Sequence, residues 1–211
     1  MSTLYERLST AVLEGDIDQV PTLVDKGLED GLAPKAILDS GLTLGMNEVG
    51  VRFKRGDMYV PEVVMSADAM HAGLDILRPH LSAAGAKLVG KIILGTVKGD
   101  LHDIGKNLVS MMLQGAGFQV VDLGTNITSQ QFVEAVKEHQ PHILGMSALL
   151  TTTMPRMEET IQALKEAGIR DGVKIMAGGA PVTQDFVEKI GGDAYGANAA
   201  SAVEKAKELI A

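Results

Sequence analysis

Several residue types are missing or scarce in this chain of 211 residues: it has no cysteine and no tryptophan, and aromatic residues make up only 3%. Without cysteine the chain forms no disulfide, thiolate zinc site or iron–sulfur cluster of its own, and it has no cysteine nucleophile. No uncharged apolar stretch approaches the roughly 18–20 residues of a membrane helix. The segment MSTLYERLSTAVLEGD lacks the cationic, then apolar pattern of a secretory signal. We therefore expect a cytoplasmic protein without a membrane partner.

Basic residues are also fewer than acidic ones, 19 against 27, which gives a net charge of −8. An acidic chain with few aromatic residues is poorly suited to following phosphates or stacking bases, so no nucleic-acid partner is expected. The chain has 11 methionines. Most should be flexible core filler, although Met58 and Met154 are candidates for an adaptable surface against a large ligand.

Apolar periodicity divides the chain into two predicted domains, residues 1–88 and residues 89–211. The first is helical throughout, whereas the second alternates strands and helices. The small, uncharged stretch 82–86 is the expected linker.

The first domain reads as four helices with short loops, which form a small antiparallel bundle. Asp16 is expected to cap the second helix and Gly27 to end it, and Pro34 suits the first turn of the third. A basic loop, residues 52–57, should precede a long fourth helix that opens at Pro61.

The second domain contains five short apolar runs that predict strands, at 91–96, 118–124, 142–147, 173–178 and 194–196. Helical stretches are expected at 104–115, 129–138, 156–167, 183–190 and 199–210. This α/β alternation predicts a five-stranded parallel sheet of the flavodoxin or Rossmann type, with strand order 2-1-3-4-5. Ligands of such sheets bind beyond the carboxyl ends of the strands.

Asp100 and His102 stand in the loop after the first predicted strand. A lone loop histidine most often bonds to nearby backbone, but a carboxylate two residues away favours a ligand role. The carboxylate fixes the imidazole tautomer and makes the other nitrogen a better ligand. One supported histidine suits the axial position of a metal already held in a macrocycle, whereas a free ion needs three or four ligands. The remaining histidines, His71, His80, His139 and His142, are expected to be structural or solvated.

The stretch Asp100-Leu101-His102-Asp103-Ile104-Gly105 resembles the D-x-H-x-x-G signature of the cobalamin-binding domain in corrinoid proteins and methionine synthase. Two further family elements follow at the family's spacing. Ser147-Ala148-Leu149 matches S-x-L, with 41 residues between Gly105 and Ser147, and Gly178-Gly179 follows with 28 residues between Leu149 and Gly178. The helical region resembles the cap of methyl-transferring members, and the overall size resembles the small corrinoid proteins of methanogen and acetogen methyltransferase systems.

This resemblance implies a cofactor, cobalamin, bound base-off with His102 as the lower cobalt ligand. Asp100 would hold the other imidazole nitrogen, and the Thr153 hydroxyl would extend the pair into a relay, at a position where methionine synthase has serine. Ser147 would face the buried base of the nucleotide tail, and Ala199 would lie at the far end of its slot. The full set of implied cofactor-binding residues is Gly99, Asp100, Leu101, His102, Asp103, Ile104, Gly105, Ser147, Leu149, Thr151, Thr153, Gly178, Gly179, Ala199 and, in the cap, Tyr59.

In this family, cobalt(I) is four-coordinate and discards its lower ligand, whereas methylated cobalt(III) takes the histidine back. The residues would tune cobalt and would not act as catalysts on a substrate. Because the chain has no cysteine for zinc-thiolate activation, we interpret it as a non-catalytic carrier of one-carbon metabolism. Its implied partners are a donor-specific methyltransferase, an acceptor methyltransferase that uses tetrahydrofolate or coenzyme M, and a corrinoid reductive activator. The cap would protect the methyl group and move about residues 82–87.

Three other functions share this type of domain. The first is the small subunit of an adenosylcobalamin mutase, which the helical region disfavours. The second is a cobalamin-sensing regulator, which would need a basic recognition helix, whereas residues 1–88 carry a net charge of −5 from 8 basic and 13 acidic residues. The third is a phosphoacceptor signalling domain, which needs an acidic cluster where this chain has Ile92-Ile93-Leu94-Gly95.

Overall fold

The structure, a computed structural model, describes residues 3–83 and 88–211. It divides into two compact units. The helical unit contains the residues up to 89 together with 114–117, and the sheet unit contains residues 90–113 and 118–211. No helix in the described ranges is long and apolar enough to cross a membrane.

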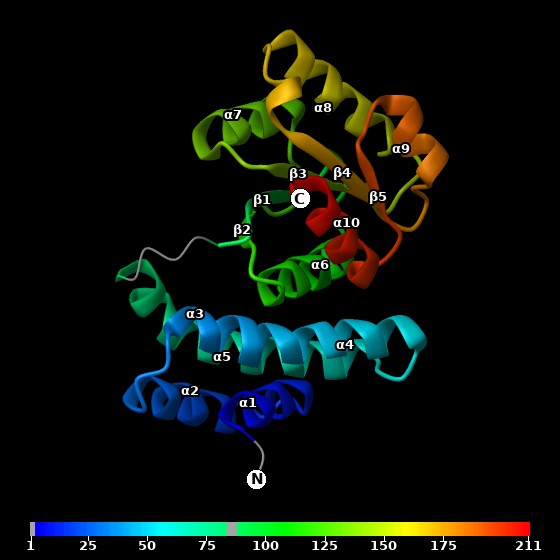
Figure 1. The fold of residues 1–211 in the computed structure, drawn as a ribbon. Coiled ribbons are helices and arrows are strands. Elements are labelled where there is room, and N and C mark those ends of the chain that lie inside the picture. Colours follow the sequence, from blue (N-terminus) through cyan, green and yellow to red (C-terminus); the bar gives the residue numbers. More distant parts are fainter. Residues whose placement is uncertain (1–2, 84–87) are drawn as a thin grey trace. The chain divides into compact units, whose positions relative to one another are not determined.

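The helical unit consists of α1 (Leu4–Leu13), α2 (Gln19–Glu29), α3 (Pro34–Ile37), η1 (Leu38–Leu42), α4 (Thr43–Arg55) and α5 (Val60–Ala83) (Figure 1). The π-helical turn η1 joins α3 to α4, so the described part of this unit has four helical rods, as the apolar pattern predicts. Its core is built from aliphatic side chains that are fully buried, among them Leu8, Val12, Val24, Ile37 and Leu42.

The limits of these helices differ from the prediction in two places. Gly27 does not end α2, which continues to Glu29. A Cβ at Gly27 would lie only 2.9 Å from Leu4 and 3.0 Å from Ile37, so the glycine allows close helix packing. The predicted basic loop is also wrong, because residues 52–55 form the last turn of α4 and Gly56 ends it in the left-handed conformation, with φ +80°. Basic side chains at a helix carboxyl end complement the helix dipole.

Two further predictions concern the start of α2, at Asp16, and the linker that follows α5. The residue directly before α2 is Asp18, which makes no capping bond with its side chain, but the predicted Asp16 carboxylate accepts a hydrogen bond from the Gln19 N–H (2.9 Å) at the first residue of the helix. The expected linker 82–86 begins too early, since α5 runs to Ala83. Residues 84–87, and with them the predicted motion about 82–87, lie outside the described residues.

The sheet unit contains β1 (Lys91–Thr96), β2 (Gln119–Asp122), β3 (Ile143–Ser147), β4 (Lys174–Gly178) and β5 (Ala194–Gly196). Its helices are α6 (Ile104–Gly115), α7 (Ser129–His139), α8 (Pro155–Glu166), α9 (Gln184–Ile190) and α10 (Ala199–Ile210), with a short 3-10 turn η2 (Arg170–Gly172). The strands are parallel and run in the order β2-β1-β3-β4-β5, which confirms the predicted topology.

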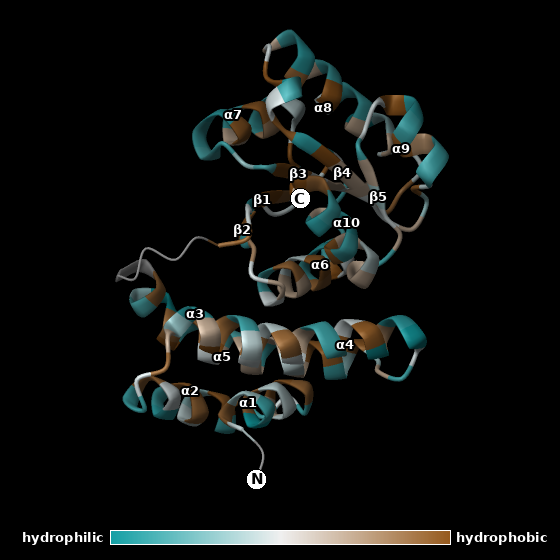
Figure 2. Cartoon of the chain, viewed as in Figure 1, coloured by the Kyte–Doolittle hydropathy of each residue, from teal (hydrophilic) through white to brown (hydrophobic). Residues whose placement is uncertain are grey.

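Helices cover both faces of this sheet: α7, α8 and α9 lie on one face, and α6 and α10 on the other (Figure 1). Buried side chains of β1, β3 and β4, including Ile93, Leu144 and Ile175, form one core cluster with Phe132 of α7 and Ile161 of α8. Figure 2 shows the consequence for the sequence pattern: β3 and β4 contain hydrophobic residues, whereas the helices around them alternate hydrophobic and hydrophilic residues. Because all five strands are parallel, their carboxyl ends lie along the same edge of the sheet, which we call the rim.

Candidate functional site

The loop after β1 begins with a tight turn that is fixed by backbone and side-chain bonds. The Asp100 N–H donates to the Val97 carbonyl (3.1 Å), and Gly99 between them has φ +82°, a conformation that favours glycine. Thr96 is fully buried, and its hydroxyl donates to the His102 carbonyl (2.9 Å). The backbone of the loop is thus tied to the end of the strand.

Asp100 and His102 form the pair that the sequence predicts. Asp100 Oδ1 lies 2.7 Å from His102 Nδ1 and also accepts a hydrogen bond from the His102 N–H (3.1 Å). The Asp100 side chain is completely buried, whereas 52% of the His102 side chain is exposed. Within the described residues the His102 ring makes its hydrogen bond through Nδ1, which leaves Nε2 free to meet a ligand.

The remaining oxygen of Asp100 connects this loop to the one after β3. Asp100 Oδ2 accepts hydrogen bonds from the N–H groups of Leu149 (2.7 Å) and Leu150 (3.2 Å) and from the Thr153 hydroxyl (2.8 Å). Thr153 Oγ1 also lies 2.9 Å from the Leu150 carbonyl, so its single proton is shared between two acceptors. The chain His102–Asp100–Thr153 is therefore continuous.

These contacts determine the ionisation of Asp100. Burial alone would raise its pKa, but hydrogen bonds from His102, the Leu149 N–H and Thr153 outweigh burial and hold the pKa well below its ordinary value. An ionised carboxylate is only an acceptor, so the proton in the short contact belongs to His102 Nδ1. With that proton on Nδ1, the lone pair of the imidazole is on Nε2, which is the nitrogen that can bind a metal.

Apolar side chains are exposed around this pair. Leu101 and Ile104 are 73% and 79% exposed, and Leu149 and Leu150 are 42% and 41% exposed. A Cβ placed on Gly105 would meet no atom within 4 Å, so space is open at the start of α6. Apolar residues rarely cluster on a monomer's surface without a partner, and these four belong to the two loops that Asp100 connects. The rim suits a broad apolar group that brings its own metal.

The small residues at the other strand ends have a packing role in the structure. A Cβ on Gly178 would lie 2.7 Å from the Gly196 carbonyl oxygen, and one on Gly179, whose φ is +130°, would lie 1.9 Å from that of Ala148. These glycines are thus required by close backbone contacts. Ala199 is buried at the start of α10. Whether this group also lines a ligand slot stays a prediction.

The other predicted contacts are more scattered. Ser147 is half-buried at the end of β3, while Asp103 and Thr151 are exposed in the loops after β1 and β3. Tyr59 belongs to the helical unit, where it is 71% exposed and its N–H donates to Glu62 Oε2 (2.8 Å) at the start of α5. Their contacts with a cofactor stay predictions.

The two methionine candidates are core residues in the structure. Met58 is buried within the helical unit, and Met154 packs on the core of the sheet unit. The default interpretation as core filler therefore describes both.

The remaining histidines occupy structural or exposed positions, as expected. His142 Nδ1 accepts a hydrogen bond from the Lys91 N–H (3.0 Å), and the His139 carbonyl accepts one from Lys91 Nζ (2.9 Å). His80 is exposed on α5, and burial lowers the pKa of His71 in the same helix. None of them has the buried carboxylate partner of His102.

Models of the B12 binding domain match residues 90–204 and residues 4–78, which together cover most of the chain. The dimethylamine corrinoid protein of Methanosarcina barkeri is 49% identical over 210 residues, or 99% of this chain and 98% of the relative. The chain belongs to the corrinoid proteins of methylamine methyltransferase systems.

Two further relatives support this family membership. Trimethylamine corrinoid protein 1 of Methanosarcina acetivorans is 42% identical, over 98% of this chain and 97% of the relative. Among solved structures, the methanol:cobalamin methyltransferase complex MtaBC from Methanosarcina barkeri matches with a TM-score of 0.88 and 35% identity, over 98% of this chain and 79% of that chain. Homologues of this kind are corrinoid carriers and not enzymes.

The residues of this corrinoid protein fit cobalamin. In the described ranges, no group of three or more His, Cys, Asp or Glu side chains comes together to hold a free metal ion. A cobalt ion already held by a corrin ring needs only one protein ligand, and His102 Nε2 supplies a free nitrogen among exposed apolar side chains. The donor set and the rim therefore agree with the family's cofactor.

Sequence reasoning missed three residues that support the corrinoid protein's His102 loop. Asn126 bonds to the backbone of Gly99 and Asp100, and Lys106 pairs with Asp122. Their signal in the sequence is weak, since an asparagine in a loop and a lysine in a helix are both common. Only the fold brings the segment after β2 against the loop after β1.

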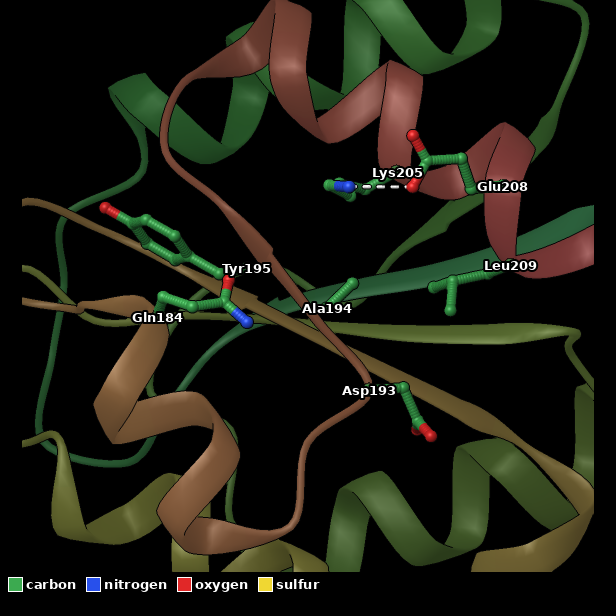
Figure 3. A pocket seen from close by; sticks show the side chains of 7 residues that line it. All are labelled: Gln184, Asp193, Ala194, Tyr195, Lys205, Glu208 and Leu209. Atoms are coloured by element: carbon green, nitrogen blue, oxygen red, sulfur yellow. Dashed lines mark hydrogen bonds and ion pairs between the residues drawn. The ribbon is translucent and has the colours of Figure 1, made fainter.

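A separate cavity of about 260 Å³ lies along β5 (Figure 3). Its polar lining is already engaged: Lys205 pairs with Glu208 (2.7 Å), and Asp193 pairs with Arg170 (2.8 Å). None of the predicted cofactor-binding residues lines it. It therefore adds nothing to the site around His102.

Proposed function

We propose that this corrinoid protein binds cobalamin with His102 as the lower axial ligand and carries a methyl group between two methyltransferases. The observation that carries the proposal is the exposed imidazole, whose Nδ1 is held by the buried Asp100 carboxylate while its Nε2 is free. When bound, the cobalt of cobalamin supplies the nucleophile that accepts a methyl group and later gives it up.

The protein's own residues would control how firmly the imidazole is held out toward the cofactor. Asp100 fixes the Nδ1–H tautomer and strengthens Nε2 as a donor. When Nε2 is released it can accept a proton, and the resulting positive ring would be stabilised by the adjacent carboxylate. Thr153 and the N–H groups of Leu149 and Leu150 would keep that carboxylate in place both when Nε2 is bound to cobalt and when it is released.

The corrin would rest on the exposed apolar rim of Leu101, Ile104, Leu149 and Leu150, which excludes water from the lower face. Ser147, Gly178, Gly179 and Ala199 are proposed to line the slot for the nucleotide tail, with Thr151 at its entrance. Tyr59 is proposed to contact the upper face.

We propose dimethylamine as the methyl donor, since the dimethylamine corrinoid protein shares 49% of its residues with this chain and the trimethylamine protein shares 42%. The partners would be the methyltransferase that serves the amine, an acceptor methyltransferase that uses coenzyme M or tetrahydrofolate, and a reductive activator. The donor-specific partner would activate the amine, because this chain has no cysteine for a thiolate zinc site.

The test uses the full chain loaded with cobalamin, reduced chemically, and mixed in turn with dimethylamine, trimethylamine, monomethylamine or methanol and the methyltransferase for each. We expect the visible spectrum of the cofactor to change fastest with dimethylamine and its methyltransferase. No change with any pair would overturn the carrier proposal, and a faster change with another donor would overturn the choice of amine. The variant His80→Ala, which alters an exposed histidine on α5, serves as a matched control and should behave as the native chain does.

A further inference from the structure

Asn126 has an unusual backbone conformation directly beside the His102 loop. Its φ is +58°, one of two positive values among the described residues other than glycine. In this conformation its side-chain Oδ1 accepts a hydrogen bond from the Gly99 N–H (2.8 Å), and its own N–H donates to the Asp100 carbonyl (3.0 Å). A residue with positive φ whose side-chain oxygen and backbone N–H both bond to the same loop indicates that the position of this loop is constrained.

A second connection reaches the other end of the same loop. Lys106, in the first turn of α6, is only 5% exposed, and its ammonium group forms an ion pair with Asp122 and a hydrogen bond with Asn107 Oδ1 (2.7 Å). A buried ammonium group needs such partners, because an unpaired one is costly. Asp122 uses its other oxygen to accept from the Gly124 N–H (2.8 Å).

Both contacts originate in residues 122–126, which we call the β2–α7 segment. This segment is itself attached to β1, because the Thr96 N–H donates to the Gly124 carbonyl (3.0 Å) and the Ile127 N–H donates to the Thr96 carbonyl (2.9 Å). The loop that carries His102 is therefore held near both ends by one segment that continues the sheet.

We propose that the β2–α7 segment is a positioning element for the axial ligand, with Asn126 and Asp122 setting how firmly His102 is presented to cobalt. The inference rests on the proposed function, because it assumes that His102 binds cobalt. Among the described residues, neither of these two forms a hydrogen bond with the imidazole. They act by limiting the motion of the backbone at Gly99–Asp100 and at the start of α6, so loosening either end favours the form in which His102 is detached.

The experiment measures the ratio of His102-coordinated to detached cofactor in full-length protein loaded with methylcobalamin, from its visible spectrum. Asn126→Gly keeps the left-handed backbone and removes the acceptor for Gly99. We expect the ratio to fall about fivefold, the equilibrium effect of losing one hydrogen bond. Asn126→Asp keeps an acceptor at the same place and tolerates the same φ, so it should restore a ratio close to that of the native chain.

Two further variants complete the design. Asp122→Asn removes the charge opposite Lys106 and should lower the ratio from the other end of the loop, so the proposal stays testable if Asn126→Gly does not fold. Gln140→Gly is the matched control, because Gln140 is the other non-glycine residue with positive φ (+46°) in the described chain and caps α7. It should leave the ratio unchanged.

The possible outcomes separate this inference from the function itself. A native ratio in both Asn126→Gly and Asp122→Asn overturns the positioning role. So does a reduced ratio that Asn126→Asp fails to restore. A native protein with no histidine on cobalt overturns the proposed axial ligand and the positioning role with it.

Discussion

The two ends of the sheet each carry a histidine, and the two residues are used in opposite ways. At the carboxyl end, His102 gives Nδ1 to the buried Asp100 and keeps Nε2 free on a half-exposed ring. At the amino end, His142 uses Nδ1 to accept a hydrogen bond from the backbone of Lys91. The same side chain is a candidate metal ligand in one place and a backbone brace in the other.

The difference lies in the partner of Nδ1. A carboxylate can only accept, so it fixes the proton on Nδ1 and releases Nε2 as a donor toward a metal. A backbone N–H can only donate, so it occupies the lone pair of Nδ1 and fixes the proton on Nε2. The partner therefore decides the tautomer, and the tautomer decides whether the outer nitrogen can bind cobalt.

The largest expected effect comes from removing the histidine at each end in turn. His102→Ala should abolish histidine coordination in cobalamin-loaded protein and change the visible spectrum of the methylated form. His142→Ala should leave that spectrum unchanged and lower the free energy of unfolding by about 0.5–1.5 kcal/mol, the value of one hydrogen bond. If the two variants gave the same spectrum, the contrast between the two ends would be refuted.

Replacing the carboxylate should have the next largest effect. In Asp100→Asn, the amide group must turn an N–H toward a donor on one side, so at least one buried bond to His102 or to the loop after β3 is lost. We expect a loss of roughly 1–3 kcal/mol in the free energy of unfolding, together with weaker histidine coordination. Asp171→Asn, at an exposed position in η2, is the control and should change neither the free energy of unfolding nor the spectrum.

Acid should reduce the contribution of Asp100, at the carboxyl end of the sheet, to the free energy of unfolding. The folded-state pKa of Asp100 is below its ordinary value, so its stabilising contribution is complete above about pH 4 and is lost as the pH falls through the lower folded value. Unfolding of the cofactor-free chain, measured from about pH 6 down to pH 2, should therefore show a steeper loss of stability than in Asp100→Asn. Parallel curves for the two proteins would contradict this assignment.

The smallest effect should follow changes to Thr153, the last residue in the chain His102–Asp100–Thr153. Thr153→Val keeps the shape and removes the hydroxyl that donates to Asp100, which should cost about 0.5–1.5 kcal/mol. Thr153→Ser keeps the hydroxyl and should retain most of the stability and the native spectrum. An effect of Thr153→Ser as large as that of Thr153→Val would show that packing, and not the hydrogen bond, is what matters at this position.

Local patterns made the sheet and the central pair predictable. The strands are short apolar runs bounded by glycine, and Asp100 and His102 are two residues apart in one loop, so their proximity follows from the chain itself. Gly27 was harder because a close helix contact explains it, and the basic stretch 52–57 was harder because α4 continues to Arg55 and ends only at Gly56. Asn126 lies 26 residues after Asp100, and only the pairing of β2 with β1 brings them together.

The central claim is that a nitrogen of His102 binds cobalt, and isotope labelling tests it most directly. The full chain is produced with ¹⁵N-histidine, loaded with cobalamin of natural isotopic composition, and reduced to cobalt(II) for electron paramagnetic resonance. We predict that the nitrogen splitting changes from a triplet in unlabelled protein to a doublet in labelled protein, and that His102→Ala loses the doublet while His142→Ala keeps it. A triplet that persists in the labelled protein would place the cofactor's own base on cobalt and contradict the account.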